Sequence, residues 1–324
     1  MRSTFLVTGA TGFIGSNLVR ELVRQKQYVS IITRDKRLNW RLSDISSKLD
    51  IFECDIQNAK LGEIVNKIKP DYIFHLARYG NFPQEDNIDT MIDINLKGTI
   101  NLINAVKQNS FKLFINAGSG DEYGIKKTAM QETDLLEPVN NNGVIKSAIT
   151  LFCQKEAIRN ALPIINLRLF TPYGYFEDDF RLIPSVIISA LNNKPIKVSV
   201  PTNVRDFIFI EDVIDAYMRA IKIKHAYGQI YNIGSGKQHS VGEIVQMTQK
   251  ITKNKSDVEW GVIPKQARYI EPLLWESDIS KTKRVFQWKP KNTIESGLAK
   301  TIAWFRKNKN LYRSAPKIAN PQAY

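Results

Sequence analysis

The feature that most constrains the fold is a set of three evenly spaced glycines near the N-terminus. Residues 8–15, with the sequence TGATGFIG, follow a short apolar stretch at 5–8 that is typical of a buried strand. Apolar side chains then recur at helical spacing from Ile14 to Val23. In such a strand–turn–helix unit, Gly9 allows the tight turn, Gly12 lets a ligand approach the backbone, and Gly15 lets the helix pack closely on the strand. The pattern predicts a dinucleotide-binding turn.

The start of the predicted helix explains how this turn would bind its ligand. Free N–H groups and the helix dipole at that end both favour the pyrophosphate of a dinucleotide. The candidate cofactor contacts in this segment are Gly9, Thr11, Gly12, Phe13, Ile14 and Gly15.

The end of the second predicted strand bears on the choice of dinucleotide. NAD needs a carboxylate there for its ribose 2′-hydroxyl, whereas the 2′-phosphate of NADP needs cations. The chain has TRDKR at 33–37, in which Arg34 is placed to meet the phosphate with Arg37 assisting, while Asp35 favours NAD. We predict NADP as the cofactor, with NAD as the alternative.

Apolar strands alternate with amphipathic helices through the first half of the chain. Strands are predicted at 5–8, 29–33, 50–54, 72–76, 111–116 and 164–169, with prominent helices at 88–108 and 144–160. Strands that alternate with helices form a parallel sheet that is covered on both faces. The predicted fold class is therefore α/β, a Rossmann-type doubly wound parallel sheet with a smaller mixed α/β C-terminal substrate domain.

After about residue 170 the pattern becomes irregular and mixes short strands with short helices. A strand at 206–210 and a helix from Asp212 are expected to return to the first domain, and a last helix is expected near 294–307. The predicted dinucleotide-binding domain covers 1–170 plus about 206–235. The predicted substrate domain covers about 171–205 and 236–310, and 311–324 is predicted to be a loose tail.

Composition argues against several other classes of protein. The formal net charge is +14, but the basic residues are spread along the chain and no nucleic-acid-binding signature is present. Three scattered histidines and two cysteines without ligand spacing predict no metal site. No apolar run reaches the ~20 residues needed to span a bilayer, and the N-terminus enters a strand at once instead of forming a signal peptide. We expect a cytoplasmic protein without a membrane span or a nucleic-acid partner.

Further motifs follow the glycine turn in a fixed order, and they are specific only in combination. They are CDI at 54–56, HLA at 75–77, NLKGTINL at 95–102, RLFTPYG at 168–174, RLIP at 181–184, RDFIFIED at 205–212 and WKP at 288–290. From residue 4 to about 305 the chain resembles the extended short-chain dehydrogenase/reductase family, specifically its nucleotide-sugar epimerase, dehydratase and 4-ketoreductase branch. The resemblance implies further cofactor contacts from Asp55, Ile56, Leu76, Ala77 and Asn95.

The same resemblance implies roles for individual side chains. Ser119 matches the family's catalytic Ser/Thr, and Lys146 matches the catalytic Lys that also binds the nicotinamide ribose. Arg205 and Arg268 match arginines that grip the diphosphate of a nucleotide sugar, a task suited to forked guanidinium donors. Arg181 is a third candidate for that task.

The chain departs from the family pattern at position 142. Asn142 stands where the family has the Tyr of Tyr-x-x-x-Lys, in which the Lys one helical turn away lowers the pKa of the phenol. Asn has no proton to exchange with a substrate oxygen. Thr171 is a lesser departure, because the family more often has a substrate-contacting Asn there.

An acidic pair, Asp121 and Glu122, is a third departure. Nucleotide-sugar 4,6-dehydratases carry such a pair after their catalytic Thr, but here it lies one position closer to the following Tyr-Gly, with Gly120 where their Asp belongs. This spacing resembles that of reductases that act on 4-keto-6-deoxy sugars.

Several groups are candidates for the missing proton donor. Asp121 or Glu122 would serve if burial raised its pKa, and water held by Ser119 and Lys146 is another candidate. Alternatively, Asn142 is an engineered inactivating change, or it marks different chemistry such as epimerisation through carboxylate-assisted enolisation.

These observations predict an NAD(P)-dependent enzyme that reduces or epimerises a 4-keto-6-deoxy nucleotide sugar in deoxysugar biosynthesis. The alternatives are a 4,6-dehydratase that uses Asp121 and Glu122, and a catalytically silent dinucleotide-binding protein. The resemblance also implies a nucleoside-diphosphate sugar as the small-molecule partner. It further implies a homodimer, formed through the helices at 88–108 and 144–160.

Overall fold

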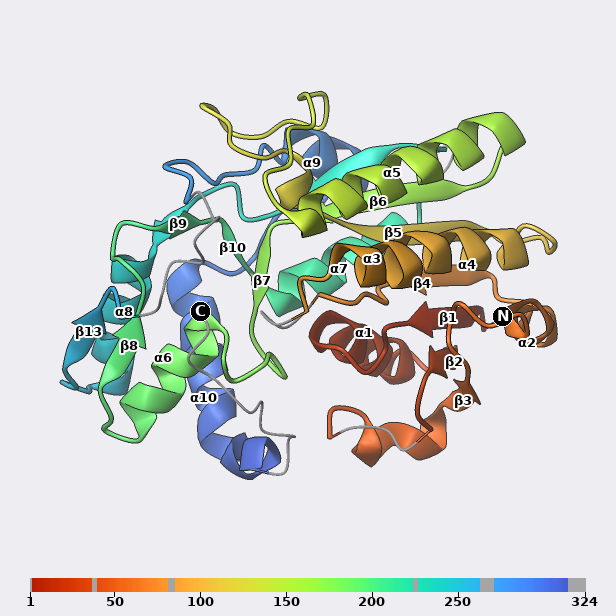
Figure 1. The fold of residues 1–324 in the computed structure, drawn as a ribbon. Helices are drawn as coiled ribbons and strands as arrows, with labels where there is room; N and C mark the ends of the chain where they lie inside the picture. Colours follow the sequence, from red (N-terminus) through yellow and green to blue (C-terminus); the bar gives the residue numbers. More distant parts are fainter. Residues whose placement is uncertain (1, 37–39, 81–84, 224–226, 263–270, 314–324) are drawn as a thin grey trace.

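Seven parallel strands form the main sheet of the protein (Figure 1). The computed structural model describes residues 2–36, 40–80, 85–223, 227–262 and 271–313. The strand order is β3–β2–β1–β4–β5–β6–β11, and every pairing in it is parallel. The strands are β1 (Thr4–Thr8), β2 (Tyr28–Thr33), β3 (Asp50–Glu53), β4 (Tyr72–His75), β5 (Leu113–Ser119), β6 (Ile164–Leu169) and β11 (Ile230–Ile233). This doubly wound order confirms the predicted fold class.

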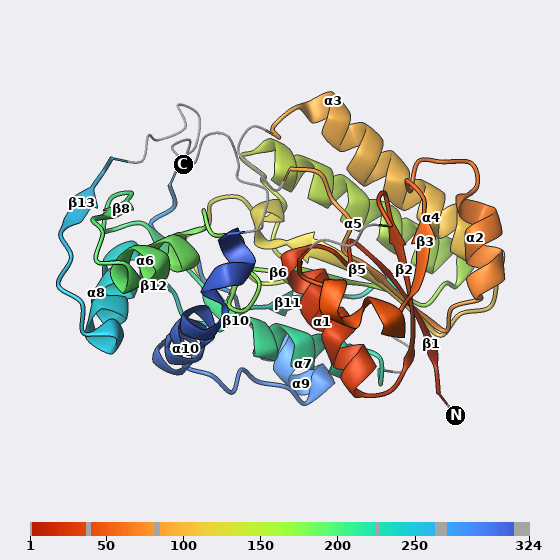
Figure 2. The ribbon, with the colours of Figure 1, turned by 90° about the horizontal axis from the view of Figure 1, so that it is seen from below.

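Helices cover both faces of the sheet (Figure 2). In β1, Phe5 and Val7 enter one core and Leu6 enters the other, as expected when successive side chains point to opposite faces. One face is covered by α1 (Phe13–Arg24), α7 (Ile210–Ala220) and α9 (Ser280–Phe286). The other is covered by α2 (Leu61–Ile68), α3 (Ile88–Met91), the π-helical η2 (Ile92–Lys97), α4 (Gly98–Val106) and α5 (Asn141–Asn160).

The remaining elements form a smaller part beyond the carboxyl ends of the sheet strands (Figure 1). It contains three two-stranded sheets, β10–β7, β12–β9 and β13–β8. Their strands are β7 (Thr171–Tyr173), β8 (Ile196–Val198), β9 (Val204–Arg205), β10 (Phe207–Phe209), β12 (His239–Ser240) and β13 (Val258–Trp260). The helices of this part are α6 (Leu182–Leu191), α8 (Val241–Thr252) and α10 (Ile294–Arg313). Two short 3-10 turns belong to the large sheet instead: η1 (Ser43–Lys48) lies between β2 and β3, and η3 (Gly120–Glu122) follows β5.

The elements expected at 206–212 and near the C-terminus are present, and the structure adds detail to both. The strand expected at 206–210 is present as β10, which pairs with β7, and the helix expected from Asp212 is α7, which packs on the large sheet; the place beside β6 in that sheet is taken by β11. The last helix has a kink at Asn308, where the backbone angles are not helical, close to its expected end near residue 307, and a further helical stretch runs to Arg313. Its end is held because the Tyr312 hydroxyl donates to Glu177 O (2.7 Å) and the Tyr312 ring stacks on Phe305. Residues 314–324 of the predicted tail lie outside the described residues, and the predicted domain boundaries stay a prediction.

Two kinds of feature are absent from the described residues. None of their helices is long and apolar enough to cross a membrane. Within the same residues, no group of three or more His, Cys, Asp or Glu side chains is placed to hold a metal ion.

Candidate active site

The glycine turn joins β1 to α1 at the carboxyl end of the sheet. Gly9 has a φ of +69°, and a Cβ there would lie 2.5 Å from Ala77 N. A Cβ at Gly15 would lie 2.1 Å from Gly9 O, whereas one at Gly12 would meet only Gly9 O, at 3.3 Å. Gly9 and Gly15 are therefore required by packing inside the protein, and Gly12 presents an exposed, open backbone.

The start of α1 fits the phosphate group of a dinucleotide. Its N-cap is Gly12, no side chain caps it, and its first turn contains no acidic residue. Uncapped N–H groups at a helix start bind anions, with support from the helix dipole. The side chains around this turn are those of Thr11, Phe13 and Ile14, which are half-buried and uncharged. None of them repels a bound pyrophosphate.

The residues predicted to meet the adenosine half lie near the ends of β2 and β3. Arg34 and Asp35 are exposed after β2, and Thr33 Oγ1 donates to Asp35 O (3.2 Å). Asp55 is half-buried after β3, where it accepts from Gln57 N (2.9 Å). The neighbouring Ile56 is buried directly against Gly98, and Arg37 lies outside the described residues.

The loop after β4 lies beside the glycine turn. Leu76 N donates to Thr8 O (3.2 Å), and Ala77 N lies against Gly9, as the contact of an added Cβ shows. Asn95 is buried and holds this loop from η2: its Oδ1 accepts from Tyr79 N (2.7 Å) and its Nδ2 donates to Tyr79 O (2.9 Å). Asn95 therefore shapes the loop that borders the predicted cofactor.

The end of β5 brings the predicted catalytic residues into one turn. Ser119 caps the 3-10 turn η3, because its Oγ accepts from Asp121 N (3.1 Å). Ser119 N in turn donates to Glu122 Oε1 (2.9 Å). Ser119 and Asp121 are half-buried and stay within reach of a ligand.

Glu122 and Asp121 are neighbours that face different surroundings. Glu122 is 0% exposed and accepts from Arg168 Nε (2.7 Å) inside the protein, where burial raises the pKa of the Glu122 carboxyl. A Cβ at Gly118 would lie 2.6 Å from Glu122 Oε1, so the space around this carboxylate is filled. This position argues against direct contact between Glu122 and a substrate and leaves Asp121 as the accessible acid.

The first turn of α5 packs against Asp121. Asn142 Nδ2 donates to Asp121 Oδ2 (2.6 Å), while Asn142 Oδ1 is buried without a hydrogen-bond partner among the described residues. A Cβ at Gly143 would lie 2.4 Å from Asp121 O, so this close approach needs glycine. Asn140 caps the helix by accepting from Gly143 N (2.7 Å).

Lys146 lies one helical turn after Asn142 and is buried. Its Nζ donates to Ala117 O (2.6 Å) in β5. Burial and the nearby Arg78 lower the pKa of Lys146 to about 8. A lysine in this position can change its protonation state near neutral pH and can place positive charge beside Asp121.

Tyr123 and Tyr173 do not replace the missing phenol in this arrangement. A Tyr-x-x-x-Lys spacing does occur from Tyr123 to Lys127, but the Tyr123 hydroxyl is buried and donates to Asn232 Oδ1 (2.6 Å). The Tyr173 hydroxyl is also buried and donates to Ile294 O (3.3 Å). Burial raises the pKa of both phenols, which makes each a poor proton donor.

Arg78 is a site residue that the sequence interpretation missed. It follows the HLA motif at 75–77 and is exposed, yet surrounding protein and Arg181 lower the pKa of its guanidinium to about 10. Asp121 and Lys146 both interact electrostatically with Arg78. The available signal was its place directly after a motif that borders the cofactor.

The predicted substrate-binding residues lie in different places: Arg181 lies near Asp121, whereas Arg205 has partners of its own. Arg181 precedes α6 and lies close enough to Arg78 to affect its pKa, so it shares the region of Asp121. Arg205 forms an ion pair with Glu271 (2.9 Å) and lies over the Trp275 ring (5.6 Å). Half-buried Thr171 begins β7, and Arg268 lies outside the described residues.

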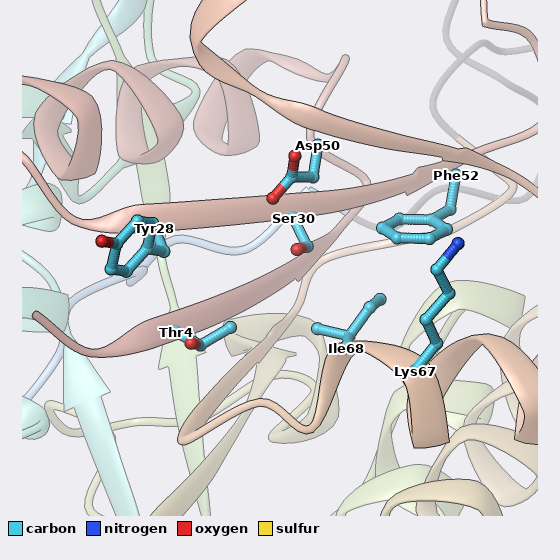
Figure 3. Close-up of a pocket in the computed structure, with 7 residues that line it drawn as sticks. All are labelled: Thr4, Tyr28, Ser30, Asp50, Phe52, Lys67 and Ile68. Atoms are coloured by element: carbon cyan, nitrogen blue, oxygen red, sulfur yellow. The ribbon is translucent and has the colours of Figure 1, made fainter.

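A separate pocket of about 440 Å³ lies at the other end of the sheet strands (Figure 3). Its lining includes Thr4, Tyr28 and Asp50, the first residues of β1, β2 and β3, together with Lys67 and Ile68 of α2. Parallel α/β sheets bind ligands at the carboxyl ends of their strands, so this pocket is not the candidate active site.

Known proteins share this architecture and sequence pattern. The model of the "NAD dependent epimerase/dehydratase family" matches residues 5–234. UDP-glucose 4-epimerase of Lactobacillus helveticus is 27% identical, over 95% of this chain and 98% of its own. dTDP-D-glucose 4,6-dehydratase of Mus musculus is 28% identical, over 98% of this chain and 92% of its own. The crystal structure of UDP-glucuronic acid 4-epimerase from Bacillus cereus with UDP-glucuronic acid and NAD has a TM-score of 0.84 at 27% identity, over 94% of this chain and 99% of its own.

Proposed function

The chain belongs to the NAD dependent epimerase/dehydratase family, and from this we propose that it transfers a hydride between a nicotinamide dinucleotide and a ring carbon of a nucleoside-diphosphate sugar. One observation carries the proposal. Ser119, Asp121 and Lys146 gather at the end of β5, close to the open glycine turn at the end of β1. Between them lies β4, so the site falls where the strand order reverses, the usual place for a dinucleotide in such sheets.

The reaction we propose is reduction or epimerisation at a sugar carbonyl carbon, with a 4-keto-6-deoxy nucleotide sugar as the substrate in deoxysugar biosynthesis. Support comes from Gly120, which stands where dehydratases have their Asp. A Cβ at Gly120 would make ordinary contacts of 3.4 Å with the rings of Phe170 and Trp275, and Gly120 itself offers no carboxyl group for the removal of a proton. The internal ion pair of Glu122 with Arg168 also disfavours dehydration through the acidic pair.

For the cofactor we propose NADP in preference to NAD. Exposed Arg34 directly after β2 supports this choice, because β2 ends in Thr33 and offers no carboxylate at its last residue. NADPH and NADH titrations of the protein and of Arg34→Ala test it. We expect Arg34→Ala to weaken NADPH binding about tenfold and to leave NADH binding unchanged. Equal weakening of both dinucleotides would contradict the assignment.

Binding of both ligands tests the whole proposal. Titration calorimetry of the dinucleotide-loaded protein with UDP- and dTDP-sugars, including a 4-keto-6-deoxy sugar, should give saturable binding and turnover. Arg181→Ala should weaken binding of the nucleotide sugar, while dinucleotide affinity stays unchanged. A protein that binds the dinucleotide but none of the sugars would instead be the catalytically silent alternative.

We also propose a homodimer formed through α5. Val144, Leu151 and Ile158 recur every seven residues, which puts them on one helix face, and their side chains are 47%, 56% and 75% exposed. An apolar stripe of this kind is typical of a helix that packs against a second copy. Leu151→Glu combined with Ile158→Glu should produce monomers in light scattering. Leu273→Glu, at a position that is 92% exposed elsewhere, is the control.

A further inference from the structure

We propose that Asp121 is the proton-transferring catalytic residue of this site and that Asn142 is the positioning residue that orients its carboxylate. The inference rests on the proposed hydride transfer and names the group that takes the place of the phenol. It depends on a side-chain contact between Asp121 and Asn142 in this chain.

Three contacts fix Asp121 in place. Its N–H donates to Ser119 Oγ (3.1 Å), and its Oδ2 accepts from Asn142 Nδ2 (2.6 Å). Its carbonyl lies so close to Gly143 that a Cβ there would be 2.4 Å away. A carboxylate has about four acceptor positions, so one bond from Asn142 leaves capacity for a substrate hydroxyl. The side chain is both oriented and half-buried, as a group that meets a ligand must be.

The second half of the Asn142 amide points to a hydroxyl donor. Asn142 Oδ1 is buried and has no hydrogen-bond partner among the residues that the structure describes. A buried acceptor without a partner destabilises the protein, so a bound donor is expected to satisfy it. Sugar hydroxyls are such donors. The amide can therefore hold Asp121 through its nitrogen and receive the sugar through its oxygen.

Neighbouring charges suit the reaction at Asp121. Lys146 from α5 and Arg78 from the loop after β4 bring positive charge toward it, and Arg181 lies beside Arg78. Positive charge of this kind stabilises negative charge that develops on a sugar oxygen. The acidic groups in the same region are Glu122, which is paired with Arg168, and Glu85 and Asp178, which act on Arg78.

The proton balance is complete with Asp121 as the acid–base group. When a sugar alcohol becomes a ketone, its C–H hydrogen leaves as hydride, which the dinucleotide accepts. The O–H bond breaks at the same carbon, its electron pair forms the carbonyl, and its proton goes to the Asp121 carboxylate. In the direction of ketone reduction, the Asp121 carboxylic acid returns this proton to the sugar oxygen.

Asp121→Asn is the principal test, with exposed Asp89→Asn as the matched control. A general acid–base group contributes about 100-fold or more to the rate, so kcat should fall by that factor while dinucleotide affinity changes less than about threefold. The acid limb of the pH profile of kcat/KM for sugar oxidation should disappear. The alkaline limb, which belongs to Lys146, should persist. An Asp121→Asn protein with unchanged kcat would overturn the inference.

Variants at position 142 test the positioning role. Asn142→Asp puts two carboxyl groups in contact, so one proton is shared and the acid limb should move to higher pH. A merely structural role for Asn142 would lower protein stability without moving that limb. Asn142→Tyr removes the amide that holds Asp121 and should lower kcat. Activity that appears only in Asn142→Tyr would identify the present chain as inactive and would overturn the inference.

Binding measurements separate failure of this inference from failure of the proposed function. The affinity of the NADP⁺-loaded protein for the nucleotide sugar should weaken as pH falls in the unmodified chain and should be independent of pH in Asp121→Asn. Absence of sugar binding refutes the proposed function. Binding without any turnover also refutes the proposed function, whereas turnover together with the same pH dependence of sugar binding in both proteins refutes the role of Asp121 alone.

Discussion

The turns that follow β1 and β5 meet the same site but are built in opposite ways. The β1 turn consists of backbone: glycines remove side chains, and the start of α1 is left without a side-chain cap. The β5 turn consists of side chains: Ser119 caps it, Arg168 neutralises Glu122, and Asn142 holds Asp121. The backbone N–H groups of the β1 turn are therefore available to an external anion. The side chains of the β5 turn bond mostly to one another, and Asp121 is the acid of that turn that a ligand can reach.

The largest effect is expected from breaking the buried ion pair of the β5 turn. Glu122→Ala leaves the Arg168 guanidinium, which is 1% exposed, as an uncompensated buried charge. This should lower the free energy of unfolding by about 3–5 kcal/mol in urea denaturation. Asp121→Ala, one position away, should cost about 1 kcal/mol or less. Similar losses of stability in Glu122→Ala and Asp121→Ala would show that the two carboxylates do not differ in their surroundings, one buried and paired and the other accessible.

The β1 turn should be broken next most strongly by adding a single methyl group. Gly15→Ala places Cβ 2.1 Å from Gly9 O, where only backbone could move, and should destabilise the protein by about 3 kcal/mol. Gly12→Ala, with its nearest contact at 3.3 Å, should cost less than about 1 kcal/mol but should weaken dinucleotide binding. Gly62→Ala, which meets nothing within 4 Å in α2, is the control and should be neutral or slightly stabilising.

This contrast explains what could be predicted from the sequence. The glycine turn was predictable because its causes are local: three missing side chains, an apolar strand before them and helical spacing after them. The division between Asp121 and Glu122 was not predictable, because it depends on Arg168, 46 residues further along the chain. Arg78 was missed for the same reason, since its partners come from other loops.

The predicted helix at 88–108 shows a further limit of local reasoning. The structure has α3, a π-helical stretch and α4 in its place. Asn95 lies in the π-helical stretch, which is an irregularity common at functional sites, and its amide holds the Tyr79 backbone. Apolar periodicity predicts the helix but carries no information about such a contact. The roles assigned to individual site residues stay predictions until variants are measured.

The loop after β4 lies between the two turns, and a change in the contacts that hold it should have an intermediate effect on stability. Asn95→Leu removes the hydrogen-bond partners of both Tyr79 N and Tyr79 O. Leaving these two groups unpaired should lower the free energy of unfolding by about 2 kcal/mol. Because Arg78 lies on this loop, sugar binding should weaken together with stability. Exposed Asn104→Leu on α4 is the control, and denaturation together with calorimetry supplies both readouts. Unchanged sugar affinity in a destabilised Asn95→Leu protein would separate the loop from the site.

The smallest effect concerns pH and belongs to the β5 side alone. Lys146 has its pKa lowered from 10.5 to about 8 in the folded protein, so between these values the unfolded chain binds more protons than the folded one. The free energy of unfolding therefore rises with pH across that window because of Lys146, by about 1 kcal/mol between pH 7 and 9. Lys146→Met should remove this rise in urea denaturation series, whereas exposed Lys127→Met should keep it. A rise that persists in Lys146→Met would have to come from other groups. In that case Lys146, which donates to the end of β5 from α5, would not be the titrating group beside the β5 turn.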